Sequence, residues 1–208
     1  MKNNDYGRSM IEMLGVLAIV GALSTGGIVG YTKMLNQSKI NTSIEQISVV
    51  SGQLSTIGAN GGNYSGLNNR AAIKLKAVLQ DMVSGSNLKN PFGGNITIAS
   101  SSMSSNDDLA YTIRYDGLNH QACMAMATHD WGSVKNSSFI AVIVGANVHN
   151  NTVNAATLGC SGSLYNLSEA VGCNGGSTLG VPMPATEAGQ ACSGCRSSGF
   201  CSIVLKYY

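Results

Sequence analysis

The residues with the most evident chemistry in this chain are its cysteines. All of them lie in the second half of the sequence: Cys123, Cys160, Cys173, Cys192, Cys195 and Cys201. An even number of cysteines predicts disulfides in an oxidising compartment, whereas the Cys192–Cys195 spacing would suit a metal or redox pair in a reducing one. A second pair with that spacing is absent from the sequence, and the three histidines show no ligand spacing. The sequence therefore favours up to three disulfides, with no metal and no cofactor.

The spacing of the cysteines leaves their connectivity open. We expect Cys123 to pair with one of the three C-terminal cysteines, which would tie the last strand to the sheet, and Cys160 to pair with Cys173 across a local loop. The region from Gly145 to Gly199 is rich in glycine and has few large apolar residues. We expect it to bury little core by itself and to depend on disulfides, each worth a few kcal/mol.

A second candidate group is the carboxylate of Glu12. It is the one charge in the segment Met10–Val29, which reads MIEMLGVLAIVGALSTGGIV. That length matches the roughly 20 residues with which an α-helix crosses a bilayer. A secretory signal peptide and a plain membrane anchor are the competing interpretations, but the carboxylate argues against the first and has no use in the second. Because ionisable groups in membrane segments are costly and usually functional, we expect a single membrane span with a task for Glu12.

Composition and charge exclude several function classes. Only 11% of the residues are charged, and 12 Lys and Arg against 10 Asp and Glu leave a formal charge of +2. This balance is far from that of a basic nucleic-acid-binding protein, and it predicts no nucleic-acid site. The membrane segment would place the rest of the chain outside the cytoplasm, where its cysteines can oxidise.

An enzymatic function finds little support in the sequence. Ser168, His149 and Asp130 could be combined into a hydrolase triad, but no Gly-x-Ser-x-Gly motif is present. Asp107 and Asp108 form a carboxylate pair, although adjacent acidic residues in a loop are usually a solvated turn. We therefore predict that the chain is not an enzyme.

The elements that must position these residues begin with one long helix. After the apolar segment, large apolar residues recur at steps of three and four, which is the period of a helix with one buried face: Ile40, Ile44, Ile47, Val50, Leu54 and Ile57. No proline interrupts Arg8–Ile57, so we expect a nearly continuous helix of about 75 Å that ends at Gly58. Ser, Thr, Asn and Gln between the stripe positions are expected on its wet face.

The remainder of the chain predicts a sheet-containing head. We expect a loop over Gly58–Asn69, a second helix over Arg70–Val83 and a short helix over Leu118–Thr128, together with strands over Asn95–Ala99, Leu109–Tyr115, Phe139–Val144 and Cys201–Tyr208. A helix followed by strands is typical of an α+β fold, in which the long N-terminal helix packs on an antiparallel sheet.

The N-terminal motif resembles the processing site of type IV prepilins and type II secretion pseudopilins. Gly7 is followed by Arg8, and Glu12 stands fifth when Arg8 is counted as the first residue of the mature chain. In that family a membrane peptidase cuts after the glycine and leaves a glutamate at the fifth position. Arg8 stands where the family usually has Phe or another apolar residue.

This resemblance implies a domain organisation, a set of partners and a location. Residues 1–7 would be a leader peptide, 8–30 the membrane and filament-core half of the helix, 31–57 its amphipathic half, and 58–208 the globular head. Cleavage by prepilin peptidase would precede methylation of the new amine. Inner-membrane assembly machinery would then build a homo-oligomeric filament on the cell surface, in which Glu12 pairs with the amine of a neighbouring subunit.

The resemblance favours a type IVb-like pilin that forms a filament for adhesion, aggregation, motility or conjugation. A type II secretion pseudopilin and a minor or tip pilin share the same N-terminal motif and stay open as alternatives. A membrane-anchored binding module that is never cut after Gly7 is an alternative of a different class.

Overall fold

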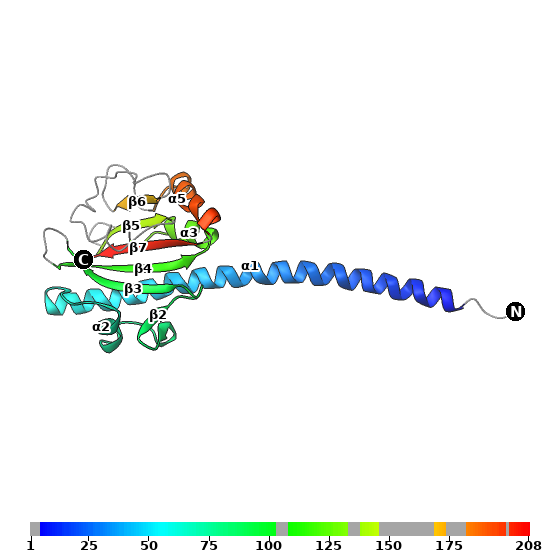
Figure 1. The fold of residues 1–208 in the computed structure, drawn as a ribbon, viewed down its shortest axis with the longest axis horizontal. Coiled ribbons are helices and arrows are strands. Elements are labelled where there is room, and N and C mark those ends of the chain that lie inside the picture. Colours follow the sequence, from blue (N-terminus) through cyan, green and yellow to red (C-terminus); the bar gives the residue numbers. More distant parts are fainter. Residues whose placement is uncertain (1–4, 103–107, 133–137, 146–168, 174–181, 199) are drawn as a thin grey trace. The chain divides into compact units, whose positions relative to one another are not determined.

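The computed structural model describes residues 5–102, 108–132, 138–145, 169–173, 182–198 and 200–208 (Figure 1). Side chains are described in the same ranges except for residues 5–9, 169–173 and 196–198. The chain forms two compact units, Met1–Lys39 and Ile40–Tyr208. The second unit is the head, and it includes the C-terminal part of the first helix.

Helix α1 runs from Asp5 to Gly61 and confirms the long helix expected from the sequence. It ends one turn later than predicted, because Gly58 stays helical and the backbone turns at Gly62, whose φ of +77° is the left-handed conformation that favours glycine. Gly58 is needed where it is, since a Cβ there would lie 2.1 Å from the hydroxyl of Tyr64.

The stripe on α1 forms one wall of the core. Ile40, Ile47, Val50 and Leu54 are buried, and Ile44 and Ile57 are partly buried against the same cluster. The expectation that the intervening polar residues all face solvent is wrong for two of them, because Ser43 and Gln46 are buried. Gln46 is hydrogen-bonded to Asp81 and Tyr115 of the head, whereas the buried Ser43 Oγ has no hydrogen-bond partner among the described residues.

Within the described residues, the sheet has seven strands, all paired antiparallel, in the order β1-β2-β3-β4-β7-β5-β6. The strands are β1 (Val83–Ser84), β2 (Asn87–Lys89), β3 (Asn95–Ser101), β4 (Ala110–Leu118), β5 (Phe139–Gly145), β6 (Glu169–Cys173) and β7 (Cys201–Tyr207). The predicted strands over Asn95–Ala99, Leu109–Tyr115, Phe139–Val144 and Cys201–Tyr208 are confirmed with small shifts of their ends. The last strand, β7, lies between β4 and β5, so the end of the chain completes the middle of the sheet.

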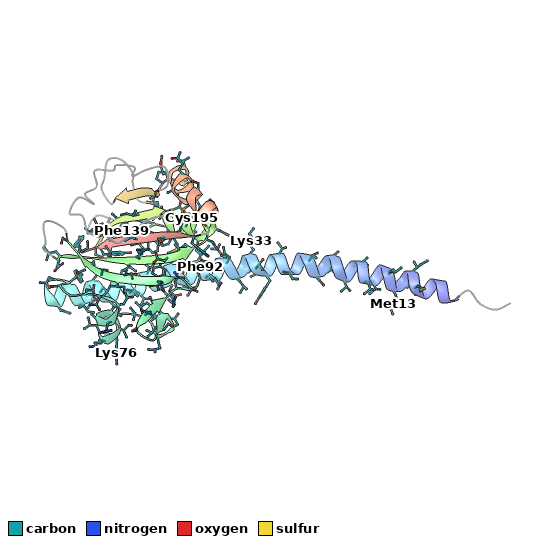
Figure 2. All side chains as sticks on the ribbon, in the orientation of Figure 1. Met13, Lys33, Lys76, Phe92, Phe139 and Cys195 are labelled. Atoms are coloured by element: carbon teal, nitrogen blue, oxygen red, sulfur yellow. A yellow bond between two sulfur atoms is a disulfide. The ribbon has the colours of Figure 1, made fainter. Side chains whose placement is uncertain are left out.

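Alternate residues of the central strands share the core with α1. These residues are Ile96, Ile98, Tyr111, Ile113, Tyr115, Val142, Val144, Ile203, Leu205 and Tyr207. All seven residues of β7 are buried, because the strand has neighbours on both edges and cover on both faces. Figure 2 shows many side chains crowded in the head, around the strands and the C-terminal part of α1.

Two further helices, α3 (His120–Ala127) and α5 (Ala185–Ser198), lie together at one end of the strands (Figure 1). Helix α3 carries Cys123, as predicted, and Asn119 caps it by accepting a hydrogen bond from Ala122 N. Helix α5 was not predicted. It buries Ala188, Ala191, Cys192 and Cys195, so this part of the glycine-rich region contributes more to the core than expected.

The predicted helix over Arg70–Val83 is confirmed only at its start. Helix α2 spans only Asn69–Lys74 and is followed by the 3₁₀ turn Gln80–Met82 and by β1. The helix stops because Lys76 adopts a positive φ of 55°. Leu75, assigned to the buried face by its spacing, is 52% exposed.

The buried tyrosines should make the head sensitive to alkali. Burial raises the phenol pKa of Tyr111, Tyr115 and Tyr207 well above the ordinary value of 10.0. Because the folded pKa is the higher one, this stability is fully present below pH ~10 and is lost as pH rises above it, by about 1.4 kcal/mol per pH unit for each tyrosine. We expect these phenols to ionise together with unfolding, which absorbance at 295 nm and the fluorescence of Trp131 would both report. Ionisation of all tyrosines near pH 10 with unchanged Trp131 fluorescence would contradict this.

Candidate assembly site

The first unit presents an apolar surface that nothing within the unit covers. The large apolar side chains from Met10 to Leu35 are exposed, and Ile11, for example, is 74% exposed. Met13 in Figure 2 points outward from the helix. By length and composition this helix could cross a membrane. Such a continuous apolar surface needs cover from lipid or from other protein chains.

The serine and threonine hydroxyls of Met10–Leu35 donate to backbone carbonyls of the same helix. Ser24 Oγ donates to Val20 O at 2.7 Å, Thr25 Oγ1 to Ala22 O at 2.9 Å, and Thr32 Oγ1 to Val29 O at 3.0 Å. Hydroxyls bonded in this way can enter an apolar environment at little cost.

Glu12 differs from these hydroxyls because it has no partner of its own. It is exposed, and among the described residues it makes no ion pair or hydrogen bond. Gly7 and Arg8 lie in the first turns of α1, where only the backbone is described. A carboxylate in such a surface must be neutralised by a cation from another molecule if the surface becomes buried.

In the head, hydrogen bonds attach the buried polar side of α1 to the sheet. Tyr111 Oη donates to Ser51 O at 2.9 Å and lies 3.0 Å from Ser55 Oγ. Gln46 Nε2 donates to Asp81 Oδ2 at 3.0 Å, and Tyr115 Oη lies 3.4 Å from Gln46 Oε1. The alternation of Tyr111, Ile113 and Tyr115 could have indicated from sequence that both phenols face α1, but it could not have named their partners.

The described cysteines form two disulfides at one end of the sheet. Cys123 of α3 is bonded to Cys192 of α5, and Cys195 of α5 is bonded to Cys201 of β7. Cys123 therefore pairs with a C-terminal cysteine, as expected. That bond joins two helices, however, and the last strand is tied by the second bond instead. The expected pairing of Cys160 with Cys173 lies outside the described residues, as does any side-chain contact of Cys173.

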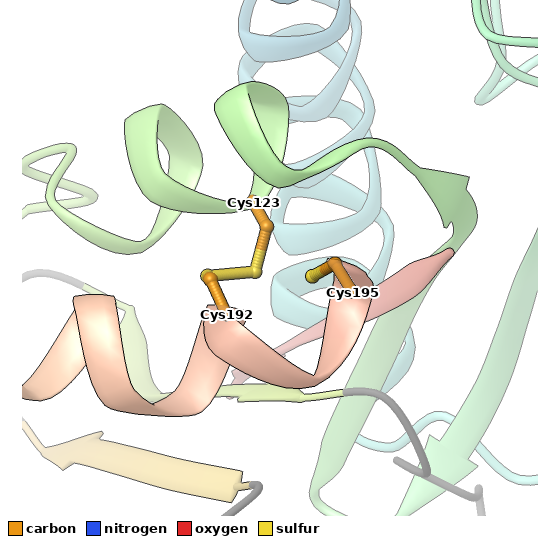
Figure 3. Close-up of side chains that lie close together, drawn as sticks. All are labelled: Cys123, Cys192 and Cys195. Atoms are coloured by element: carbon orange, nitrogen blue, oxygen red, sulfur yellow. A yellow bond between two sulfur atoms is a disulfide. The ribbon is translucent and has the colours of Figure 1, made fainter. Parts of the chain in front are cut away.

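The Cys192-Ser193-Gly194-Cys195 motif is thus divided between two bonds. Its two cysteines do not bond with each other, although both point to the same side of α5 (Figure 3). Sequence reasoning could not indicate this division, because it did not predict α5 there.

A hydrogen-bonded turn between β2 and β3 is attached to the backbone of β4. Asn90, 5% exposed, accepts from Phe92 N at 2.9 Å and from Gly94 N at 3.0 Å, and it donates to Asp116 O at 2.7 Å. Asp116 Oδ1 in turn accepts from Ser202 Oγ at 2.6 Å. The sequence marked Asn90–Gly94 as a turn but did not reveal its contact with β4.

Of the residues considered for a catalytic role, those that the structure describes make local packing and hydrogen-bond contacts. Asp130 accepts a hydrogen bond from Gly132 N at 3.0 Å, and the rings of His129 and Trp131 pack edge to face at 4.6 Å. Burial lowers the pKa of His129, with a smaller opposing effect of Asp130. Asp107, His149 and Ser168 lie outside the described residues.

Comparisons with known proteins agree with this architecture. The family profile described as PilS N terminal matches residues 37–178, more than half of the chain. The major structural subunit of the bundle-forming pilus of Escherichia coli O127:H6 (strain E2348/69 / EPEC) is 24% identical over 134 residues, which cover 64% of this chain and 68% of that protein.

Two solved structures are also similar. TcpA, a type IV pilin from Vibrio cholerae El Tor biotype, superposes with a TM-score of 0.55 and 22% identity, covering 82% of this chain and 99% of that one. A type IV b pilin from Salmonella typhi gives a TM-score of 0.48 at 15% identity, covering 80% of this chain and 98% of that one. The first of these establishes the fold, a long helix packed on an antiparallel sheet.

Proposed function

Because this chain belongs to the PilS family of type IVb pilins, we propose that it is held in the membrane as a precursor, cut after Gly7 and assembled through Glu12 into a filament. Members of this family are structural subunits and not enzymes. The disulfide-bonded head would lie on the outside of the filament, and helix α1 would supply its core.

The observation that carries this proposal is the uncovered apolar surface of Met10–Val29, in which Glu12 is the one charge and has no partner among the described residues. Before assembly, an inner membrane can cover that surface, since its length suits one span. After assembly, the same surface can be covered only by equivalent helices of other copies. Transfer from lipid to a bundle of identical helices keeps the apolar residues buried at both stages.

Glu12 would fix the axial offset between neighbouring helices in the filament. Cleavage after Gly7 would create a positive amine on Arg8, four positions before the carboxylate in the sequence. In a bundle of staggered helices, the amine of one copy can lie beside Glu12 of its neighbour. Because an unpaired buried charge is strongly unfavourable, only staggers that pair the two charges are favoured.

This proposal assigns three partners. Prepilin peptidase would cut the precursor, inner-membrane assembly machinery would extract it, and further copies of the chain would surround it in an extracellular pilus. Similarity to a major pilus subunit supports a place along the filament rather than only at its tip. The two disulfides of the described cysteines support a head that lies outside the reducing cytoplasm.

Electron microscopy of the cell surface tests this function. Cells that express the chain should carry filaments that antibodies to the head label along their length, and deletion of its gene should remove them. Labelling only at filament tips would indicate a minor pilin. Unchanged filaments after deletion, together with a loss of protein secretion, would indicate a pseudopilin and contradict the proposal.

A further inference from the structure

Four buried cysteines come together where α3, α5 and β7 meet. They form the bonds Cys123–Cys192 and Cys195–Cys201, and each is at most 3% exposed. The Sγ atoms of Cys123, Cys192 and Cys195 all lie within 4.8 Å of one another. Figure 3 shows Cys195 pointing toward the bond between the other two. Each disulfide therefore lies within a small movement of the other.

Helix α5 holds an alternative partner for Cys192. Cys192 and Cys195 are three positions apart in α5, so their Cα atoms are about 5 Å apart. Disulfides usually join Cα atoms that are about 4.4–6.8 Å apart. A Cys192–Cys195 bond thus needs side-chain rotation and only small shifts of the α5 backbone.

The sulfur of Cys201 lies farther from the Cys123–Cys192 disulfide than this three-cysteine group allows. Cys201 is bonded to Cys195, but it is not one of the three cysteines whose sulfurs all lie within 4.8 Å of one another. Opening of the Cys195–Cys201 bond would therefore release two thiols with unequal access to the neighbouring disulfide. Cys195 Sγ lies within 4.8 Å of both sulfurs of the Cys123–Cys192 bond, and Cys201 Sγ does not, so Cys195 is the attacking group that the geometry favours.

We propose that this cluster is a thiol–disulfide exchange site in which Cys195 attacks Cys192 and releases Cys123. The first step requires a dithiol reductant, which gives two electrons to the Cys195–Cys201 bond, is oxidised to its own disulfide and leaves two thiols on the chain. In the second step the thiolate of Cys195 attacks Sγ of Cys192. The Cys192–Cys195 bond forms, the Cys123–Cys192 bond breaks, and Cys123 leaves as a thiolate that takes up a proton. The second step involves no net oxidation or reduction.

The exchange would couple two bonds that span very different lengths of chain. Cys195–Cys201 spans 6 positions, whereas Cys123–Cys192 spans 69 and ties α3 to α5. Reduction of the short bond would thereby also release the long one and leave α3 and β7 without disulfide links to α5. By keeping Cys195 occupied, Cys201 protects the bond between the two helices. This role does not depend on filament assembly.

Two matched single substitutions in the full chain test this inference. Cys201→Ser leaves Cys195 as the free thiol, and Cys195→Ser leaves Cys201 as the free thiol. Each purified variant is incubated in detergent at about pH 8.5, near the ordinary thiol pKa, then alkylated and mapped by proteolysis and mass spectrometry without reduction. Because only Cys195 is held beside the second bond, Cys201→Ser should yield at least about tenfold more chain with Cys123 alkylated than Cys195→Ser. It should also yield a Cys192–Cys195 peptide.

Retention of Cys123–Cys192 in Cys201→Ser, with alkylation confined to Cys195, would overturn the inference. Equal loss of the long bond in both variants would also overturn it, because position would then not matter. If Cys201→Ser does not fold, as judged by the fluorescence of Trp131, the unmodified protein is treated with limiting dithiothreitol instead. Chains with a Cys192–Cys195 bond and with both Cys123 and Cys201 alkylated support the exchange, whereas chains alkylated only at Cys195 and Cys201 contradict it.

Discussion

Replacing Glu12 with Gln should abolish filament formation while leaving the chain folded and in the membrane. The amide keeps the size of the side chain but removes its charge, so the amine of a neighbouring subunit would be buried without a counter-ion. Removing one partner of a buried ion pair costs about 3–5 kcal/mol. That cost corresponds to a hundredfold or greater loss in the association constant of each contact.

The yield of filaments sheared from cells, compared with total chain in the same cells, measures this effect. Ser24→Ala is the matched control, because it changes a polar group of the same segment that bonds within its own helix. We expect near-normal yield from Ser24→Ala and no filaments from Glu12→Gln. Glu12→Asp keeps the charge on a shorter side chain and should restore part of the yield. Normal filaments from Glu12→Gln would show that the carboxylate has no part in assembly.

Gly94→Ala should strongly destabilise the head. A Cβ on Gly94 would lie 1.8 Å from the carbonyl oxygen of Asp116, in the backbone of β4, and 3.0 Å from Asn90 Nδ2. Neither neighbour can move freely, because Asn90 is hydrogen-bonded to the same carbonyl. Overpacking of this kind costs about 3 kcal/mol, which would lower the melting temperature by about 6–12 °C.

Thermal unfolding of the full chain in detergent, followed by the fluorescence of Trp131, measures this change. Gly189→Ala is the control, because Gly189 lies in α5 with no atom within 4 Å of its added Cβ. An alanine there should raise stability by about 0.5–1 kcal/mol through its better helix propensity. Equal melting temperatures for the Gly94→Ala and unmodified proteins would mean that the turn at Gly94 does not pack closely on β4.

The parts of the fold that depend on local periodicity could be predicted from sequence. The α1 stripe, α3 and the four longer strands follow from runs of apolar residues with helical or alternating spacing. The helix predicted over Arg70–Val83 was too long. Its apolar residues have a helical spacing, but the chain leaves the helix near Lys76, whose φ is positive, and then forms the short hairpin of β1 and β2. Helix α5 was missed because Ala, Gly, Ser and Cys give it little apolar contrast.

In the candidate site, too, local features could be predicted from the sequence and contacts between distant segments could not. Gly7, Arg8 and Glu12 stand out in the sequence because their spacing is local. The sequence allowed a bond from Cys123 to the C-terminal cysteines but not the choice of Cys192, since that choice depends on how α5 packs on α3. The hydrogen bonds from Tyr111 to α1 and from Asn90 to β4 join segments distant in the sequence. They emerge only when the sheet order is known.

The mass of the N-terminal peptide from purified filaments tests the central claim most directly. Cleavage after Gly7 predicts subunits that begin at Arg8, with a free or methylated amine able to meet Glu12 of the next copy. Filament subunits that still begin at Met1 would place no such amine in the core, and the pairing that we propose as the basis of assembly would be wrong.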